Sequence, residues 1–469
     1  MDRKTGTASM RLARWACRLT DSDVPPAVRR RAVSCVQDTL GVALAGSTSG
    51  PARAARTLCG HADHGPATVL GAAGGYSPRA AAFANATAAH ALDFDDNCYA
   101  GFVHGSAIIV PALLACAQAA CATGSRAVTA YVAGAECEYA VGAATRGRLY
   151  ERGWWTTGVL GPIGAAIAAA RIAGLGVART HHALALAVAM ASGTKSCFGS
   201  DTKPLMAGRA AEAGVLCALL AAAGASGPRR PFEDPHGFVA CLNEGIFDDE
   251  ALSRLGTRWY LEQPGVDTKR IPVCLSSHAA VDAVRELAAR HRLRAGEVAR
   301  VICDVPPIVV SNLRHARPRS PAEARFSMQF AVAMTLRDPD WGLEALEPGR
   351  LADPGLGTLM QRVSMVSGPA WREPGRAAAA PEGASVRLEL RDGRVLSAYR
   401  AKAIGSADTP LDDAQMDRKF LECAGPVIGA ARAAAALGTI HELDSARPVQ
   451  ALLDALAPAA SPGAPRTAT

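Results

Sequence analysis

The chain has 469 residues, 49% of them hydrophobic and 5% aromatic, and a formal net charge of +7 at pH 7. This length exceeds what one hydrophobic core usually supports, and the Ala- and Gly-rich composition excludes a fibrous or disordered protein. The arginines are dispersed, and no basic helix is interleaved with aromatic residues. We therefore expect no nucleic-acid partner; the positive charge is better suited to attract a small anionic substrate.

Residues 8–275 carry the pattern of consecutive helices. Apolar residues recur there at three- and four-residue spacing, and Gly and Pro residues separate the apolar stretches. Because Ala and Gly let backbones approach, these helices should pack closely. The longest apolar run, residues 158–170, is too short to cross a bilayer, and arginines interrupt the first apolar stretch. We expect neither a membrane segment nor a signal peptide.

The pattern then changes to a mixture of helices and strands. A helix is expected from His278 to about His291, and another over residues 325–336. Residues 297–304 alternate and are rich in β-branched side chains, which favours a strand. Residues 385–400 indicate a hairpin that turns at Asp392-Gly393. Strands with helices between them predict a compact α+β domain.

A helical pattern resumes over residues 410–438, so the α+β region is predicted to be an insertion. The predicted fold class is mainly α, with a large all-helical domain formed by residues 1–275 plus 406–469. Residues 276–405 form the smaller inserted α+β domain. Residues 458–469 are rich in Pro, Ala, Ser and Thr, and we expect a disordered tail there.

Thirteen cysteines are scattered along the chain, mainly inside apolar stretches. No C-x-x-C pair or regular spacing indicates zinc, an iron–sulfur cluster or a disulfide framework. We therefore expect a reducing compartment and a cytoplasmic protein.

A polar segment between two predicted helices is the strongest signal of a site. It holds His90, Asp93, Asp95 and Asp96, and His104 follows shortly after. Imidazole and carboxylate groups are metal ligands, but their spacing here matches no familiar metal motif, so we predict no metal. Alternate residues of an extended segment share a side, so Asp93 and Asp95 need not face the same way as Asp96.

His104 precedes Gly105, Ser106 and a long apolar helix. An imidazole can act as acid or base near neutral pH, and the glycine would let a substrate approach. Ser106 is a candidate cap for the helix. A lone histidine is also often structural, and the residues alone leave both interpretations open.

Lys203 stands beside Pro204 at the start of a helix that ends near Gly224. A cation at a helix N-terminus is unfavourable unless an anion is bound there, so this placement suggests a carboxylate or phosphate ligand. Lys269 and Arg270 lie at the boundary between the predicted domains, where they would be placed to clamp a bound acid. A solvated lysine and an ordinary surface pair are the alternatives.

Six motifs spread over nearly the whole chain carry a family resemblance. They are residues 37–46 (QDTLGVALAG), 90–96 (HALDFDD), 104–106 (HGS), 202–205 (TKPL), 269–272 (KRIP) and 420–426 (FLECAGP). With them the chain resembles the MmgE/PrpD family, which includes 2-methylcitrate dehydratase, cis-aconitate decarboxylase and iminodisuccinate epimerase. The resemblance implies an all-helical domain with a smaller α+β lid, a homodimer, and a pocket between the domains. It also implies cofactor-independent lyase or isomerase chemistry on small di- or tricarboxylic acids.

The resemblance assigns roles to particular residues. Matched to the decarboxylase branch, His104 would move a proton and Asp93 would orient it or the substrate. Lys203 and Lys269 would hold carboxylates and stabilise enolate charge. The substrate contacts predicted around this catalytic set are Asn97, Trp155, Arg270 and Phe330.

Several of these positions depart from the family pattern. Asn97 stands where a threonine is usual, Trp155 where a histidine is frequent, and Phe330 where the decarboxylase has a tyrosine. Met206 stands where a histidine is common. The loss of an imidazole and a phenol removes two proton carriers and makes the site more apolar, which favours a substrate with an apolar part.

The leading prediction is a lyase without a cofactor. It would transfer a proton at a carbon next to a carboxylate, with loss of water or carbon dioxide. An epimerase of a dicarboxylate such as iminodisuccinate, which returns the proton to the opposite face, is the first alternative. A dimer that only binds acids is the second, because proton carriers have been lost.

Overall fold

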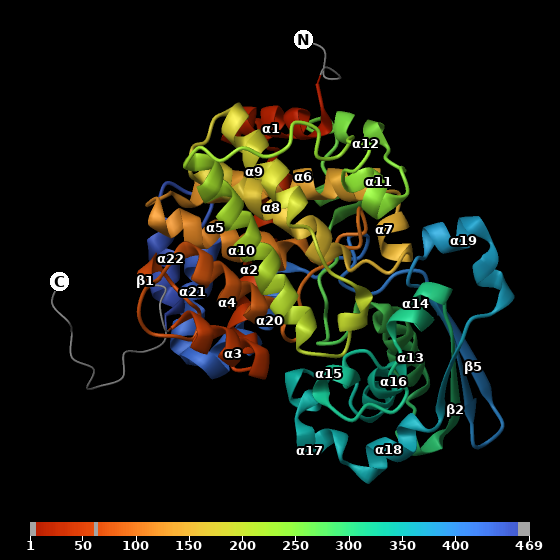
Figure 1. Ribbon diagram of the computed structural model, residues 1–469. Helices are drawn as coiled ribbons and strands as arrows, with labels where there is room; N and C mark the ends of the chain where they lie inside the picture. The colour runs from red at the N-terminus through yellow and green to blue at the C-terminus, as the bar shows by residue number, and fades with distance from the viewer. Residues whose placement is uncertain (1–5, 61–63, 458–469) are drawn as a thin grey trace.

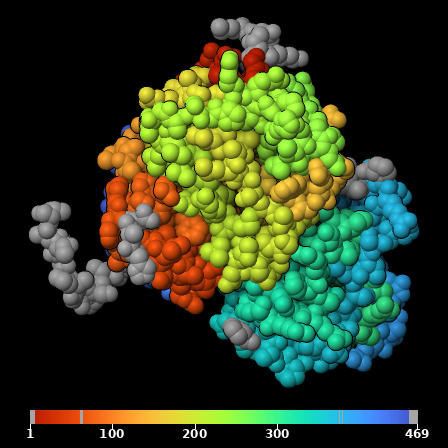
Figure 2. All heavy atoms as spheres, in the orientation of Figure 1, coloured from red at the N-terminus to blue at the C-terminus, as the bar shows by residue number. Residues whose placement is uncertain are grey.

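The computed structural model describes residues 6–60 and 64–457, and the tail predicted over residues 458–469 lies outside this range. The described chain is mainly α, as predicted, and includes a four-stranded sheet. Figure 1 shows a large body of helices and, to its lower right, a smaller lobe that holds the sheet. The space-filling view in Figure 2 shows this lobe, coloured green to blue, lying directly against the body.

The body consists mainly of helices from the first half of the chain. Ser and Thr side chains fix where several of them begin, because the hydroxyls of Thr7, Ser49, Ser77 and Thr123 accept hydrogen bonds from first-turn N–H groups. The elements of this part are α1 (Ala8–Arg18), α2 (Pro26–Gly46), α3 (Gly50–Cys59), β1 (His64–Ala67), α4 (Pro78–His90), α5 (Gly105–Ala119), α6 (Gly124–Ala144), α7 (Arg148–Glu151), α8 (Thr156–Ile172), α9 (Val177–Ala189), α10 (Thr202–Ala222), α11 (Phe238–Asn243) and α12 (Asp249–Ser253).

Helix α10 packs closely against α4 and α8. A Cβ on Gly208 would lie 2.6 Å from the Phe83 carbonyl oxygen, and one on Gly214 would lie 2.8 Å from the Ala166 backbone nitrogen. Both distances are too short for a carbon atom, so these glycines let the helix backbones touch. This packing holds the start of α10, with Lys203, near the end of α4.

Within the described residues, α10 is also long and apolar enough to cross a bilayer by length and composition alone. Core helices of globular proteins meet the same criteria, and 56% of its most apolar window is buried inside the protein. Its contacts with α4, α8 and α9 fit a core helix. Arg209 and Glu212 interrupt the apolar residues of α10, so the sequence pattern did not indicate a helix of membrane-spanning length there.

The smaller lobe combines helices with the four-stranded sheet. Its elements are α13 (His278–His291), β2 (Val298–Asp304), α14 (Pro307–Asn312), α15 (Pro321–Ala324), α16 (Met328–Arg337), α17 (Pro348–Leu351), α18 (Pro354–Met360), β3 (Val363–Val366), α19 (Pro374–Ala379), β4 (Ala384–Leu390) and β5 (Val395–Arg400). The strand order is β3-β2-β4-β5, with β2 and β3 parallel and the other pairs antiparallel. Strands β4 and β5 form the predicted hairpin. Helices α13 and α16 pack against the sheet and against each other.

One predicted boundary in the lobe is corrected. Helix α16 begins at Met328 and not at residue 325, because the Ser327 hydroxyl accepts the Phe330 N–H and caps the helix there. Residues 325 and 326 are left in the connection from α15. The side chains of both residues reach the space between the lobe and the body.

The chain returns to the body after the lobe. Helices α20 (Asp413–Ile428) and α21 (Ala430–His441) pack against α2, and α22 (Val449–Leu456) packs against α5. Lys419 of α20 lies 2.6 Å from the Asp38 carboxylate of α2, which links the two ends of the chain. These contacts fit the predicted order of body, insertion and body. The domain boundaries at residues 275 and 405 stay a prediction.

Candidate active site

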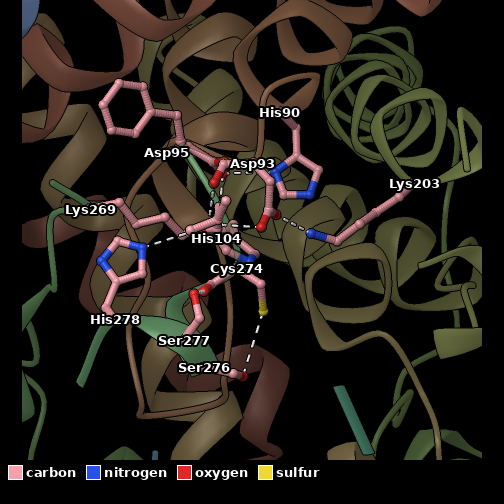
Figure 3. Close-up of polar contacts among 12 residues, drawn as sticks. His90, Asp93, Asp95, His104, Lys203, Lys269, Cys274, Ser276, Ser277 and His278 are labelled. Carbon is pink, nitrogen blue, oxygen red and sulfur yellow. Dashed lines mark hydrogen bonds and ion pairs between the residues drawn. The ribbon is translucent and has the colours of Figure 1, made fainter. Parts of the chain in front are cut away.

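The polar segment after α4 turns sharply at Asp93. Helix α4 ends at His90, and the Asp93 N–H donates a 3.2 Å hydrogen bond to the His90 carbonyl. Asp93 has a φ of 50°, in the left-handed region that Asp and Asn tolerate better than most residues. Lysines from two other segments contact the Asp93 side chain, as Figure 3 shows.

Asp93, Lys203 and Lys269 form a buried ion cluster. Lys203 Nζ contacts Asp93 Oδ1, and Lys269 Nζ lies 2.7 Å from the Asp93 carbonyl oxygen and 3.3 Å from Oδ2. Burial alone would raise the pKa of Asp93, but the two lysines outweigh it and hold that pKa well below its usual value. Burial also opposes the charge of Lys269, yet the nearby carboxylates of Asp93 and Asp95 raise its pKa. Asp93 and Lys269 are therefore both charged at neutral pH.

This cluster changes the interpretation of Lys203. The sequence suggested an external anion at the start of α10, because a cation is unfavourable there, with a solvated lysine as the alternative. Asp93 supplies that negative charge from within the protein. The Lys203 ammonium also lies 5.1 Å from the ring centre of Phe198 and 5.0 Å from that of Phe326, and such faces attract a cation. Lys203 thus has charge partners without any bound acid.

A second buried carboxylate, Asp95, contacts two histidines. Its Oδ2 lies 2.8 Å from His90 Nδ1 and 3.3 Å from His104 Nδ1. Burial would raise the pKa of Asp95, but the two imidazoles outweigh it and keep that pKa well below its usual value. Burial lowers the pKa of His90 to about 4. The His90 ring is therefore neutral at pH 7 and donates its Nδ1 proton to Asp95.

The hydrogen bonds of His104 determine which ring nitrogen carries its proton. Nδ1 lies 2.7 Å from the Asp96 carbonyl oxygen. A carbonyl oxygen only accepts, so Nδ1 is the protonated nitrogen, and the neutral ring keeps its lone pair on Nε2. The backbone N–H of His104, just before α5, donates a 3.0 Å bond to Thr157 Oγ1 in the first turn of α8. His104 is therefore held in one orientation with Nε2 as its basic atom.

His90, Asp95 and His104 also offer three atoms of metal-ligand type within 4.8 Å of one another. A metal on His104 Nδ1 would displace the proton that the Asp96 carbonyl requires. Hydrogen bonds from the Nδ1 atoms of His90 and His104 to Asp95 Oδ2 and the Asp96 carbonyl satisfy the same atoms without an ion. We therefore interpret the trio as a hydrogen-bonded group that positions His104.

Asp96 faces the opposite way, into the body. Ser106 Oγ donates to its carboxylate and lies 2.7 Å from the Tyr131 hydroxyl. Ser106 is buried in the first turn of α5. The predicted Ser106 cap is wrong, because the Ser106 hydroxyl donates its hydrogen bond to the Asp96 carboxylate and His104 occupies the N-cap position. Burial, together with the Asp38 carboxylate, raises the pKa of Asp96 to about 7.

His104 lines a small chamber of about 30 Å³ between the body and the lobe. Three other predicted residues, Asn97, Trp155 and Lys203, line it as well. Trp155 is 1% exposed, and its ring centre lies 5.3 Å from that of His90. The rest of the wall is formed by Phe102, Tyr150, Phe198, Cys274, Leu275, Asn312, Phe326 and Glu382.

Two predicted substrate contacts, Arg270 and Phe330, do not line the chamber. Arg270 lies 2.9 Å from the Asp282 carboxylate of α13, which satisfies its charge within the lobe. Phe330 is fully buried in the lobe, with its ring centre 5.8 Å from that of Trp341. The structure corrects both predictions to structural positions. Phe326, one turn earlier in the chain, reaches the chamber instead.

Sequence reasoning missed most of the chamber wall. Tyr150, Cys274 and Glu382 come from distant parts of the chain and share no motif. Glu382 accepts hydrogen bonds from the hydroxyls of Tyr99 and Ser276. Burial raises the pKa of Cys274 to about 11, so its thiol is neutral at pH 7. Of these three residues, only Cys274 could have been expected near the site from the sequence, because it lies two residues after the KRIP motif.

Comparison with protein families gives two matches that together span most of the chain. The MmgE/PrpD N-terminal domain matches residues 10–248, and the MmgE/PrpD C-terminal domain matches residues 271–444. The chain belongs to the MmgE/PrpD family. Lys269 of this MmgE/PrpD protein falls between the two matched ranges, close to the start of the second.

The similar proteins of known name are decarboxylases or decarboxylase-like. The chain is 25% identical to the cis-aconitate decarboxylase-like protein oryM of Aspergillus oryzae, over 96% of this chain and 97% of that protein. It is 28% identical to human cis-aconitate decarboxylase, over 61% of each chain, and 27% identical to the mouse enzyme, over 61% of this chain and 60% of that one. These MmgE/PrpD relatives support lyase-type function within the family and do not identify the substrate of this chain.

Proposed function

We propose that this protein is a cofactor-independent lyase that acts on a small di- or tricarboxylic acid. A proton is transferred at a carbon next to a carboxylate, and water or carbon dioxide leaves. The observation that carries the proposal is the position of His104, which lines a chamber beside Lys203 and has Nδ1 bonded to the protein and Nε2 as its basic atom. The names of the similar proteins support the lyase class.

His104 Nε2 gives or takes the proton in either variant of the reaction. In a decarboxylation, the electron pair of the broken C–C bond stays on the substrate, and His104, protonated from solvent, delivers a proton to it. In a dehydration, Nε2 removes the C–H proton, the electron pair forms a double bond, and the hydroxyl leaves as water after protonation. Asp95 and the Asp96 carbonyl face Nδ1 and stabilise the imidazolium while Nε2 holds the proton.

The lysines stabilise the negative charge that develops on the substrate. Lys203 and Lys269 share the single carboxylate of Asp93, so this cluster keeps one positive charge in excess. Lys203 lines the chamber and is placed to contact a carboxylate or enolate oxygen. Lys269 is completely buried and acts through Asp93 as a positioning residue.

The chamber is smaller than the proposed substrates. A space of about 30 Å³ holds water but not a dicarboxylic acid. The lobe contributes Phe326 and Cys274 to its wall, and the body contributes Trp155. We therefore expect the lobe to move away from the body when a substrate enters.

Proton NMR in deuterated water tests the proposal with citrate, 2-methylcitrate, cis-aconitate, tartrate and iminodisuccinate. An alkene formed by loss of water, or a product that has lost carbon dioxide, would establish a lyase. Deuterium at an otherwise unchanged stereocentre would establish an epimerase instead. No change in any of the five acids would contradict the proposal.

The role of His104 is tested separately by His104→Gln. Loss of the base should lower kcat by about 10²-fold or more while the fold is retained. His236→Gln is the matched control, because the His236 side chain is 94% exposed and lies outside the chamber. Retained activity in His104→Gln would remove His104 from the mechanism.

A further inference from the structure

A wide cavity of about 1030 Å³ lies beyond the wall formed by Lys203 and Phe326, which line both this cavity and the chamber. The body contributes Asp93 and the starts of α3 and α10 to the cavity, and α20 also lines it. The lobe contributes residues 320–322, 325–326, 343–344 and 346–347. Unlike the chamber, this cavity is large enough for a tricarboxylic acid.

Arg325 of the lobe lines the cavity. Within the described residues its guanidinium has no hydrogen bond or ion pair, and its Nε is buried without an acceptor. The neighbouring cations differ, since Lys203 pairs with Asp93 and Arg53 donates to a backbone carbonyl. Burial lowers the pKa of Arg325 to about 10, so the guanidinium is still charged at neutral pH.

A largely buried guanidinium without an acceptor is unfavourable, because its lost hydration is not replaced. Asp93 and Asp201 attract Arg325 but form no bond to it. The other acidic residues that line the cavity are exposed, and within the described residues none of them bonds Arg325. They are Glu344, Glu347 and Glu422. Within the described residues, no acidic side chain of the cavity wall therefore presents oxygens to this guanidinium.

We propose that Arg325 binds a substrate carboxylate remote from the carbon that reacts near His104, and thereby selects acids with two or more carboxylates. This inference rests on the proposed function and adds a specificity-determining residue to it. A guanidinium matches a carboxylate with two parallel hydrogen bonds, which a lysine does not reproduce. Arg325 directly precedes Phe326, so an acid held there lies against the wall that separates the cavity from the chamber.

Tricarballylate is a suitable probe because it carries three carboxylates but has neither a hydroxyl to lose nor a double bond to stabilise a carbanion. Titration calorimetry would compare wild type, Arg325→Gln, Arg325→Lys and the control Arg53→Gln, whose side chain lines the same cavity. Arg325→Gln should raise the Kd for tricarballylate at least tenfold, given the strength of charge-assisted hydrogen bonds. Arg325→Lys should raise this Kd less than Arg325→Gln does, and Arg53→Gln should change it by less than about twofold.

Thermal unfolding without ligand separates this role from a structural one. Arg325→Gln removes an uncompensated charge, so it should unfold at the wild-type temperature or above it. The rise in Tm caused by tricarballylate should be lost in the same variant. A ligand-free Tm below wild type, an unchanged Kd in Arg325→Gln, or a wild type that does not bind tricarballylate would each overturn the proposal.

Turnover distinguishes this inference from the proposed function. If wild type converts one of the five acids and Arg325→Gln has the same KM, the lyase stands and the role of Arg325 is lost. If tricarballylate binds in an Arg325-dependent manner but no acid is converted, the carboxylate site stands and the lyase proposal fails.

Discussion

Acidic residues on the two sides of the polar segment differ in charge, although all of them are buried from solvent. Asp93 and Asp95 contact lysines and histidines, which outweigh burial and hold their pKa values below the usual range. Asp96 and Glu138 lie toward the body, where burial raises their pKa values to about 7 and about 8. Within the described residues Glu138 has no hydrogen-bond partner on either carboxyl oxygen. Depth alone therefore does not decide whether an acid is charged; its partners do.

The difference also separates two roles. The acids with cationic or imidazole partners adjoin the chamber and hold Lys203 and His104 in place. The acids on the body side contact a hydroxyl or apolar surroundings and contribute no comparable ion pair. Substitutions on the two sides should accordingly change different properties, activity on one and the pH dependence of stability on the other.

Asp93→Asn should have the largest effect. It leaves Lys203 and Lys269 buried without their carboxylate, which should lower the free energy of unfolding by about 3–5 kcal/mol and abolish turnover. Asn tolerates the positive φ at this position, so backbone strain should add little. Urea unfolding measures the loss, with the exposed Asp201→Asn as control. A loss below about 1 kcal/mol would contradict the cluster's role.

Asp95→Asn should chiefly affect catalysis. Without this carboxylate the imidazolium of His104 is less stable, so kcat should fall by roughly tenfold to a hundredfold. The limb of the pH profile of kcat/KM that depends on His104 should also move to lower pH, a change that a purely structural role would not cause. If neither limb moves, Asp95 does not act through His104.

Ser106→Ala should have a moderate effect on the body side. The Asp96 carboxylate loses its hydroxyl donor, which should cost about 1–3 kcal/mol of stability. The loss should be greater at pH 8 than at pH 5.5, because the pKa of Asp96 near 7 leaves it ionised only at the higher pH. Urea unfolding at both pH values measures this, with Ser34→Ala as control because Ser34 bonds only a carbonyl of its own helix. Equal losses at both pH values would argue against this titration.

Glu138→Gln should have the smallest effect on activity and should act through the pH dependence of stability. The pKa of Glu138 is about 8 in the folded protein and near its ordinary value of 4.5 in the unfolded chain. The native state binds this proton more tightly, so Glu138 contributes stability that is lost as pH rises from about 4.5 to 8. Gln does not titrate, so the variant should lose less stability than wild type between pH 5 and 8, as unfolding curves at each pH would show. Parallel curves would contradict the raised pKa.

Much of the local structure was predictable because local patterns encode it. The helix His278–His291 and the hairpin at Asp392-Gly393 follow from periodicity and turn residues within a few positions. The start of α16 was misplaced because the Ser327 cap had not been recognised. Among the predicted site residues, His104, Asn97, Trp155 and Lys203 line the chamber.

The chamber wall and the partners of each charge were not predictable in this way. Phe330 was expected at the site and Phe326 was not, because Phe326 precedes the cap of α16 and only lobe packing decides which of the two faces the core. The sequence left open which way Asp96 faces, and the hydrogen bonds that join Asp96, Ser106 and Tyr131 decide it.

From the sequence alone, the mainly α fold, the resemblance to the MmgE/PrpD family and the residues that carry charge near the site could be inferred. Tertiary structure decided which charges meet and which stay unpaired. Asp93 lies 110 residues from Lys203 and 176 residues from Lys269, so no periodicity or spacing relates them. Their pairing, and the absence of a described partner for Arg325, arise only when α4, α10 and the lobe pack together.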